Sequence, residues 1–266
     1  MTEAVLEVSN LSKSFGGVDA VRDVTFSLAP GELLALIGPN GAGKTTCFNM
    51  ISGQLAPNRG SIAFRGGDGE RRELVGLRPR EIWRLGVGRT FQITATYPSM
   101  TVAENVQMAL ISHHRRIFNP MRLARALYRD RALELLETVG MAEQADRAAS
   151  ILAYGDLKRM ELAIALANEP RLLLMDEPTA GMAPQERIEL MKLTAGIVRE
   201  RGVSVLFTEH DVDVVFAHSH RVMVLARGQL IAQGTAEEVR ADPHVQEVYL
   251  GGGTTFGHGA GEAEHV

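Results

Sequence analysis

The sequence predicts an α/β fold in which a mostly parallel sheet carries an antiparallel β subdomain and an inserted helical subdomain. Three short runs predict strands buried in a parallel sheet: Leu33 to Ile37, which is apolar throughout, Leu172 to Met175, and Val203 to Phe207, which contains Ser204. β-rich segments surround the first run, and a long stretch with helical spacing separates it from the second. With 266 residues, the chain is long enough for one large domain of this kind.

The antiparallel subdomain is expected near the N-terminus. Val5 to Val8 alternates between apolar and polar residues, and Val18 to Leu28 is a second β-rich run that ends at the turn signal Ala29-Pro30-Gly31. Gly60 to Gly66 is bounded by turns and is expected to be an edge strand. A helix is expected to begin at Lys44, directly after the Gly-rich segment that follows the first buried strand.

Helical spacing dominates from about Val102 to Ala149, and we expect an inserted subdomain spanning about residues 93–150. Its pattern is carried by Leu123, Leu127, Leu133, Leu136 and Val139, and Gly140 is a plausible C-cap. Beyond it we expect a helix over Leu157 to Ala167, stopped by Pro170, and a hairpin joining Val222 to Ala226 with Gln229 to Ala232. Thr235 and Glu238 form a capping box for a last helix. The expected domain covers residues 4–250, and the Gly-rich tail 251–266 is expected to be disordered.

The composition excludes several classes of protein. The formal net charge of −4 argues against binding of nucleic acid by the chain as a whole. Cys47 is the single cysteine, so no internal disulfide can form. No apolar run reaches the roughly 18–20 residues that span a bilayer, and Met1 to Asn10 lacks the basic start and apolar region of a secretory signal. We therefore expect any membrane contact to go through a partner.

A phosphate-binding loop is the most specific local motif. Residues 38–45, Gly-Pro-Asn-Gly-Ala-Gly-Lys-Thr, fit G-x-x-x-x-G-K-[ST] between a buried strand and a helix, which is the context that the motif requires. Its glycines let backbone N–H groups point at phosphate oxygens, and the helix that follows adds the positive end of its dipole. Lys44 is expected to reach the β- and γ-phosphates, and Thr45 to ligate Mg²⁺. The predicted ATP-binding residues here are Gly38, Pro39, Asn40, Gly41, Ala42, Gly43, Lys44, Thr45 and Thr46.

Two acidic residues end the second buried strand. Asp176 stands at the carboxyl end of Leu172 to Met175, where a carboxylate suits the Mg²⁺ shell. Glu177 follows it and is expected to polarise the attacking water as a general base. Together with the phosphate loop, the pair predicts a P-loop NTPase core that hydrolyses a nucleoside triphosphate with Mg²⁺.

These motifs occur in an order that resembles one family, the ATPase subunits of ABC transporters, over about residues 5–250. Leu152-Ala-Tyr-Gly-Asp156, just before the expected Leu157 helix, resembles the family's signature loop. The resemblance implies that Ala153, Tyr154, Gly155 and Asp156 contact the γ-phosphate held by the other subunit's phosphate loop. It therefore implies a dimer with two shared ATP sites.

The resemblance implies three further site residues. Gln92, in Arg89-Thr-Phe-Gln92, resembles the glutamine that contacts Mg²⁺ and links the site to the helical insert. His210, after the Val203–Phe207 strand, resembles the switch histidine that contacts the γ-phosphate. Phe15 resembles the aromatic residue that stacks on adenine, although the family more often has tyrosine there. A Phe packed in the core of an edge strand stays an alternative for Phe15.

The sequence departs from the family pattern at two places that face the dimer partner. Ala153 stands where the signature usually has serine, and Tyr154 and Asp156 replace the usual glycine and glutamine. Ala183, in the loop after the carboxylates, stands where the family commonly has an aspartate that couples the two sites. A homodimer would carry these losses at both sites, so a heterodimer with a paralogous ATPase is favoured over a homodimer.

Several segments resemble the ATPases of branched-chain amino acid importers: Arg89-Thr-Phe-Gln92, Met100 to Asn105, the Leu-Ala-Tyr-Gly signature and Tyr249-Leu-Gly251. The resemblance implies membrane permease subunits as partners, a solute-binding protein acting indirectly, and a location at the cytoplasmic face of the inner membrane. Urea-importer and lipopolysaccharide-export ATPases stay open as alternatives within the family. From other classes, a soluble ABC ATPase without a membrane partner and a regulator that binds ATP without hydrolysing it stay open. The filled positions Glu177 and His210 argue against the regulator.

Overall fold

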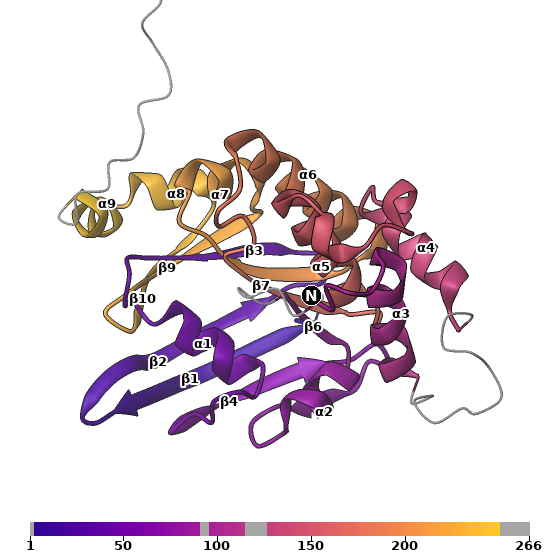
Figure 1. Ribbon diagram of the computed structural model, residues 1–266. Coiled ribbons are helices and arrows are strands. Elements are labelled where there is room, and N and C mark those ends of the chain that lie inside the picture. Colours follow the sequence, from indigo (N-terminus) through magenta and orange to yellow (C-terminus); the bar gives the residue numbers. More distant parts are fainter. Residues whose placement is uncertain (1–2, 91–95, 115–126, 251–266) are drawn as a thin grey trace, which may run out of the picture.

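The computed structural model describes residues 3–90, 96–114 and 127–250, with the side chains of residues 249 and 250 excepted. Its strands form two sheets (Figure 1). The four-stranded sheet has the order β2-β1-β4-β5, and every neighbouring pair in it is antiparallel. Its strands are β1 (Leu6–Phe15), β2 (Val18–Leu28), β4 (Arg59–Arg65) and β5 (Arg71–Glu73).

The six-stranded sheet has the order β10-β9-β3-β8-β7-β6 and forms the α/β core. Neighbouring strands from β9 to β6 are parallel, and β10 pairs antiparallel with β9 in the hairpin that the sequence predicts. Its strands are β3 (Leu33–Ile37), β6 (Val87–Thr90), β7 (Leu172–Asp176), β8 (Ser204–Thr208), β9 (Arg221–Ala226) and β10 (Gln229–Gly234).

Helices cover the core sheet and build the described part of the insert. The helix after the phosphate loop is α1 (Lys44–Ile51), and α2 (Pro79–Arg84) precedes β6. The insert contains α3 (Val102–His113), α4 (Arg129–Thr138) and the short 3₁₀ turns η2 (Ala142–Gln144) and η3 (Ala149–Ile151). The remaining helices are α5 (Tyr154–Leu166), α6 (Pro184–Arg201), α7 (Val212–His218), α8 (Ala236–Ala241) and α9 (Pro243–Leu250).

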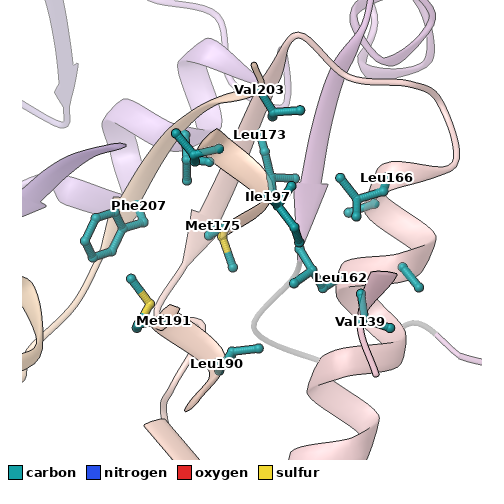
Figure 2. Close-up of a cluster of buried hydrophobic side chains, with 14 of the residues drawn as sticks. Val139, Leu162, Leu166, Leu173, Met175, Leu190, Met191, Ile197, Val203 and Phe207 are labelled. Carbon is teal, nitrogen blue, oxygen red and sulfur yellow. The ribbon is translucent and has the colours of Figure 1, made fainter. Parts of the chain in front are cut away.

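Two hydrophobic cores lie on opposite faces of the six-stranded sheet. Along β3, Leu34 and Leu36 belong to the core shared with the antiparallel sheet and α1, whereas Leu33, Ala35 and Ile37 belong to the core under the helices. Alternation along a strand sends successive side chains to opposite faces, so a strand covered on both faces is apolar throughout. Figure 2 shows the helical side, where Leu173 and Met175 of β7 pack near Leu190 and Met191 of α6 and Leu162 of α5.

Two expectations about the elements need correction, and two others lie outside the described residues. β4 pairs with both β1 and β5, so the segment Gly60 to Gly66 does not form an edge strand; the three-residue β5, which the sequence did not suggest, occupies that edge. The helix expected from Leu157 begins at Tyr154, because Ala153 already has the extended backbone of an N-cap residue (φ −63°, ψ 156°). α4 begins at Arg129, and Leu123 lies outside the described residues, as does the tail 251–266.

Candidate functional site

The phosphate loop follows β3 and leads into α1, as the motif requires. Gly38 (φ 152°) and Gly43 (φ 106°) adopt backbone conformations that other residues rarely take, and neither position has room for a Cβ atom. A Cβ at Gly38 would lie 2.0 Å from the carbonyl oxygen of Leu225, and one at Gly43 would lie 2.3 Å from that of Ala20. These glycines therefore let the loop pack directly against β9 and β2.

Lys44 is almost completely buried at the start of α1. Its ammonium group donates hydrogen bonds to the carbonyl oxygens of Gly38 (2.6 Å) and Pro39 (3.1 Å) within the loop. Burial lowers the pKa of Lys44, and the nearby carboxylates of Glu177 and Asp176 oppose that effect. The cation is thus held beside the loop, where a phosphate group would replace carbonyl oxygens as its partner.

Asp176 and Glu177 are held by one hydroxyl group of the neighbouring strand. The Thr208 hydroxyl at the end of β8 donates to Asp176 Oδ1 (2.8 Å) and accepts a hydrogen bond from the backbone N–H of Glu177 (2.9 Å). The guanidinium group of Arg89, at the end of β6, lies 3.5 Å from Asp176 Oδ2. Glu177 has a φ of 49°, a strained conformation for a residue with a side chain. Neither Thr208 nor Arg89 was expected as a site residue; a hydroxyl at the end of a buried strand was the available signal for Thr208.

Glu177 and His210 face each other. His210 Nε2 lies 2.7 Å from Glu177 Oε1, and 47% of the His210 side chain is exposed against 18% of that of Glu177. The preceding residue, Glu209, is buried and accepts hydrogen bonds from the Thr179 N–H (2.9 Å) and hydroxyl (2.6 Å). Burial raises the pKa of Glu209, and these hydrogen bonds oppose the shift. Glu209 therefore fixes the loop after Glu177 relative to the loop that carries His210.

A cavity of about 190 Å³ joins the phosphate loop to the candidate base. Its lining includes Asn40 to Thr46, Ala20 and Glu177. The hydroxyl of Thr45 and the carboxylate of Asp176 are oxygen donors of the kind that Mg²⁺ binds together with substrate phosphates. No cluster of three or more His, Cys, Asp or Glu side chains that could hold a metal occurs in the part of the chain that the structure describes.

The other predicted site residues lie apart from this cavity or outside the described residues. Phe15 ends β1 with 51% of its surface exposed, which argues against the core alternative, and Lys13 Nζ lies 5.4 Å from the centre of its ring. Ala153 to Asp156 do not line the cavity around the phosphate loop. Tyr154, Gly155 and Asp156 form the first turn of α5 rather than a loop before it. Gln92 falls in residues 91–95, outside the described residues.

A larger cavity, of about 410 Å³, lies between α2, β6, α3 and α5 and was not anticipated from the sequence. Its walls are mainly apolar and include Ile82, Trp83, Val87, Ala109, Ile164 and Ala165. Two buried oxygens of lining residues, Thr90 Oγ1 and Glu161 Oε1, have no hydrogen-bond partner within the described residues. The guanidinium group of Arg89 also lines this cavity, so one side chain reaches both the cavity and Asp176.

Comparison with known proteins decides the family. A model of the family described as ABC transporter matches residues 21–180, the segment that contains the phosphate loop, Asp176 and Glu177. The chain belongs to the ABC transporter family. This ATP-binding cassette is an ATPase, and its C-terminal residues 229–254 match a second model, described as branched-chain amino acid ATP-binding cassette transporter.

Curated relatives align along nearly the whole of this cassette. It is 40% identical over 261 residues to the high-affinity branched-chain amino acid transport ATP-binding protein LivG of Salmonella typhimurium, with 94% of this chain and 99% of the relative covered. It is 38% identical over 258 residues to the corresponding BraF of Pseudomonas aeruginosa, with the same coverage. The family expected from the motifs is therefore confirmed.

Solved structures agree with the fold. A crystal structure of the ADP conformation of MJ1267, an ATP-binding cassette of an ABC transporter, has a TM-score of 0.82, with 30% identity, 94% of this chain and 100% of that chain covered. A dimeric post-hydrolysis structure of the cassette MJ0796, bound to ADP and Pi, has a TM-score of 0.71, with 26% identity and coverage of 87% and 98%. The cassette binds nucleotide, and no helix in its described segments has the length and apolar character needed to cross a membrane.

Proposed function

We propose that this cassette hydrolyses ATP with Mg²⁺ to energise the import of branched-chain amino acids. The observation that carries the proposal is the contact between Glu177 and His210 beside the phosphate-loop cavity. Glu177 accepts a proton from water as the water oxygen attacks the γ-phosphorus, and the bond from that phosphorus to the ADP oxygen breaks. Lys44 offsets the charge on the phosphates. The substrate class rests on the names of the relatives and on the C-terminal family model.

Thr45 and Asp176 would hold the Mg²⁺, which would neutralise charge on the β- and γ-phosphates when bound. Thr208 keeps the Asp176 carboxylate oriented toward that position through a hydrogen bond of 2.8 Å. Gln92 remains a predicted Mg²⁺ contact, and Phe15 remains a predicted adenine-stacking residue. The exposure of the Phe15 ring supports that role, because stacking requires an open ring face.

The ATP site is completed by a second ATPase subunit. The first turn of α5 places the N–H groups of Tyr154, Gly155 and Asp156 at a helix N-terminus, the position from which backbone N–H groups bind phosphate. These residues lie apart from the phosphate-loop cavity of their own chain, which supports binding of a nucleotide held by a partner. Ala153 and Ala183 both lack the side chains that the family commonly uses across the dimer, and this favours a paralogous partner subunit.

A permease subunit is the proposed occupant of the 410 Å³ cavity. The walls are apolar, and the buried Glu161 Oε1 lacks a hydrogen-bond donor within the described residues. A cytoplasmic segment of the permease that carries apolar side chains and one donor would satisfy both features. A solute-binding protein would act through the permease, and the cassette would lie at the cytoplasmic face of the inner membrane. No nucleic acid is involved.

The test compares the wild type with Glu177→Gln in membranes that contain the tagged chain and its partners. We expect ATP turnover to fall by roughly 10²- to 10⁴-fold, the range for loss of a general base, while ATP binding persists. A permease and a second ATPase should be recovered with both proteins, and uptake of leucine should require turnover. Turnover that survives the substitution would overturn the role of Glu177. Recovery of soluble partners alone would overturn the transport function.

A further inference from the structure

Tyr154 lies in the first turn of α5, the signature helix, and its ring also lies against the loop that follows the candidate base Glu177. A Cβ atom added to Gly181 would lie 3.4 Å from the Tyr154 ring, in van der Waals contact, so the ring covers Gly181 on the side where a side chain would project. Gly181 has a φ of 79° and belongs to the loop between Glu177 and α6. The next residue repeats the approach, because a Cβ at Gly155 would lie 3.0 Å from the carboxylate of Glu186 in the first turn of α6.

The Tyr154 ring is supported from within α5 by a buried ion pair. Lys158 Nζ lies 5.5 Å from the centre of the ring, within the range of a cation–π interaction, and 3.0 Å from Glu161 Oε2. The side chains of Lys158 and Glu161 are only 5% and 7% exposed. Positions 154, 158 and 161 share one helix face. A desolvated ammonium group attracts a ring face more strongly than an exposed one does, so this pair restricts where the ring can lie.

The loop that Tyr154 touches is fixed at both ends to the segment around His210. At one end Thr179 donates two hydrogen bonds to Glu209, the residue before His210. At the other end Arg187 Nε donates to the Met182 carbonyl oxygen (2.9 Å), and Arg187 also pairs with Asp211 (3.2 Å), the residue after His210. A displacement of Gly181 is therefore transmitted to the backbone on both sides of His210.

We propose that Tyr154 is a positioning residue that links the signature helix to the catalytic loop of the same chain. Lys158 and Glu161 hold its ring against Gly181, and the loop 179–183 holds the Glu177–His210 pair in register. Movement of the signature helix against a nucleotide bound by the partner is thereby relayed to the chain's own catalytic pair. The inference rests on the proposed function, because the relay has a role only in a dimer with shared sites.

The relay assigns a role to Tyr154 where the family usually has glycine. A glycine would leave the buried Lys158 without a ring over it and would leave the backbone of Gly181 uncovered. Tyr154 also supplies a connection within the chain, at a site where Ala183 cannot provide the side-chain coupling that an aspartate gives. The 43% exposure of Tyr154 leaves part of the ring on the surface, beside the turn that would face the partner's nucleotide.

The first test measures hydrogen exchange of the full-length chain without nucleotide, so that it does not depend on assembly. Tyr154→Leu removes the ring, and we expect the amides of residues 179–183 to exchange roughly tenfold faster than in the wild type. Lys158→Met with Glu161→Leu removes both buried charges together, which avoids an unpaired buried ion and should leave the melting temperature close to that of the wild type. This double variant should also increase the exchange rate of the amides of residues 179–183. Unchanged exchange in both variants would overturn the proposal.

The second test measures kcat and the KM for ATP of the chain assembled with its membrane partners. Tyr154→Leu should lower kcat roughly tenfold, because small misplacements of catalytic groups are costly, while the KM changes less than about twofold. Combining it with Lys158→Met and Glu161→Leu should add no further loss of kcat per assembled complex, since all three residues act through one contact. Assembled complexes are counted because Glu161 also lines the cavity proposed for the permease, so Glu161→Leu is expected to lower recovery with the permease. Tyr154→Phe, which keeps the ring, should retain more of the kcat than Tyr154→Leu.

The control lies on the same helix. Arg159 pairs with Glu189 at 3.0 Å in a more exposed position, so Glu189→Gln should leave both exchange and kcat near wild type. Additive losses from the combined substitutions, or an equal loss in the control, would overturn the relay. The proposed function would instead be refuted if the wild type showed no ATP turnover, or if its turnover survived Glu177→Gln. The exchange experiment would still decide whether Tyr154 fixes the loop.

Discussion

The nucleotide edge of the core sheet and the region around α5 are built in different ways. At the nucleotide edge, the functional side chains stand at or just after the ends of buried strands, as Asp176, Glu177 and Thr208 do on β7 and β8. Around α5, a cavity joins residues from α2, β6, α3 and α5, and an ion pair lies along α5 itself. The first region needs only a regular parallel sheet to assemble, whereas the second depends on how the insert packs against that sheet.

The two regions differ in their proposed roles: the strand ends in ATP hydrolysis, and the α5 region in contact with other subunits. The Thr208 hydroxyl holds both carboxylate residues through two hydrogen bonds, which fix the positions of the predicted metal ligand Asp176 and of the backbone of the predicted base Glu177. The α5 region instead contains a partly exposed ring at Tyr154 and buried oxygens of Thr90 and Glu161 that find no partner among the described residues. Buried polar groups without partners are costly, and such a region is suited to gain contacts when another subunit binds.

The largest effect is expected at the nucleotide edge, from Thr208→Val. Valine has nearly the same shape but cannot donate to Asp176 or accept from the Glu177 N–H. Loss of a hydrogen bond to a buried carboxylate should lower the free energy of unfolding by about 1.5–3 kcal/mol. Misplacement of both acids should lower kcat by roughly 10²-fold. Denaturant unfolding and steady-state ATPase measurements check the two parts.

Thr208→Ser is the matched control, because it keeps the hydroxyl group and should recover most of the activity. If Thr208→Val retains the wild-type kcat, the fixed hydrogen bonds at this edge are not what positions the base, and the contrast between the two regions would be lost. The pair of variants therefore tests the first half of the comparison directly.

The same contrast explains what could be predicted from sequence. The phosphate loop and the two acids are recognisable because each motif is contiguous and its neighbours are apolar strands, and the structure places the loop and Glu177 around one cavity. The 410 Å³ cavity was missed because Trp83, Ala109 and Ile164 are distant in sequence and each looks like an ordinary core residue. Tyr154 was expected in a loop because Leu152 to Asp156 resembles the family's signature loop, whereas the structure places Tyr154 in the first turn of α5.

A smaller effect is expected at the α5 region, from filling the cavity. Ala109 of α3 lines it, and Ala109→Phe would place a ring in the space that we propose for the permease. ATP binding by the isolated chain should not change, whereas recovery with the permease and ATP-driven uptake should fall several-fold, as for an interface core residue. Trp83, the single tryptophan, lines the same cavity, so a shift in its fluorescence reports whether the space is filled.

Met108→Phe provides the control for this substitution, since Met108 is the adjacent residue on α3 and is 37% exposed outside the cavity lining. Equal losses for both variants would show that α3 itself, rather than the cavity, is what the partner requires. No loss for Ala109→Phe would remove the cavity from the proposed permease surface.

The smallest effect is a pH dependence at Glu209, where the two regions meet. Burial raises the pKa of Glu209 in the folded state above its ordinary value of 4.5, so the folded protein binds its proton more tightly than the unfolded chain does. The stabilisation from this group is present at low pH and is lost as the pH rises from about 4.5 through the raised pKa, by about 1.4 kcal/mol for every pH unit that separates the folded and unfolded pKa values.

Glu209→Gln keeps an oxygen acceptor for Thr179 but does not titrate. Subtracting its unfolding free energy from that of the wild type at each pH should therefore give a curve that falls across this window. A flat difference would mean that water or a neighbouring group keeps Glu209 ionised at its ordinary pKa, and the junction between the catalytic loop and the His210 loop would then be a hydrated contact rather than a rigid one.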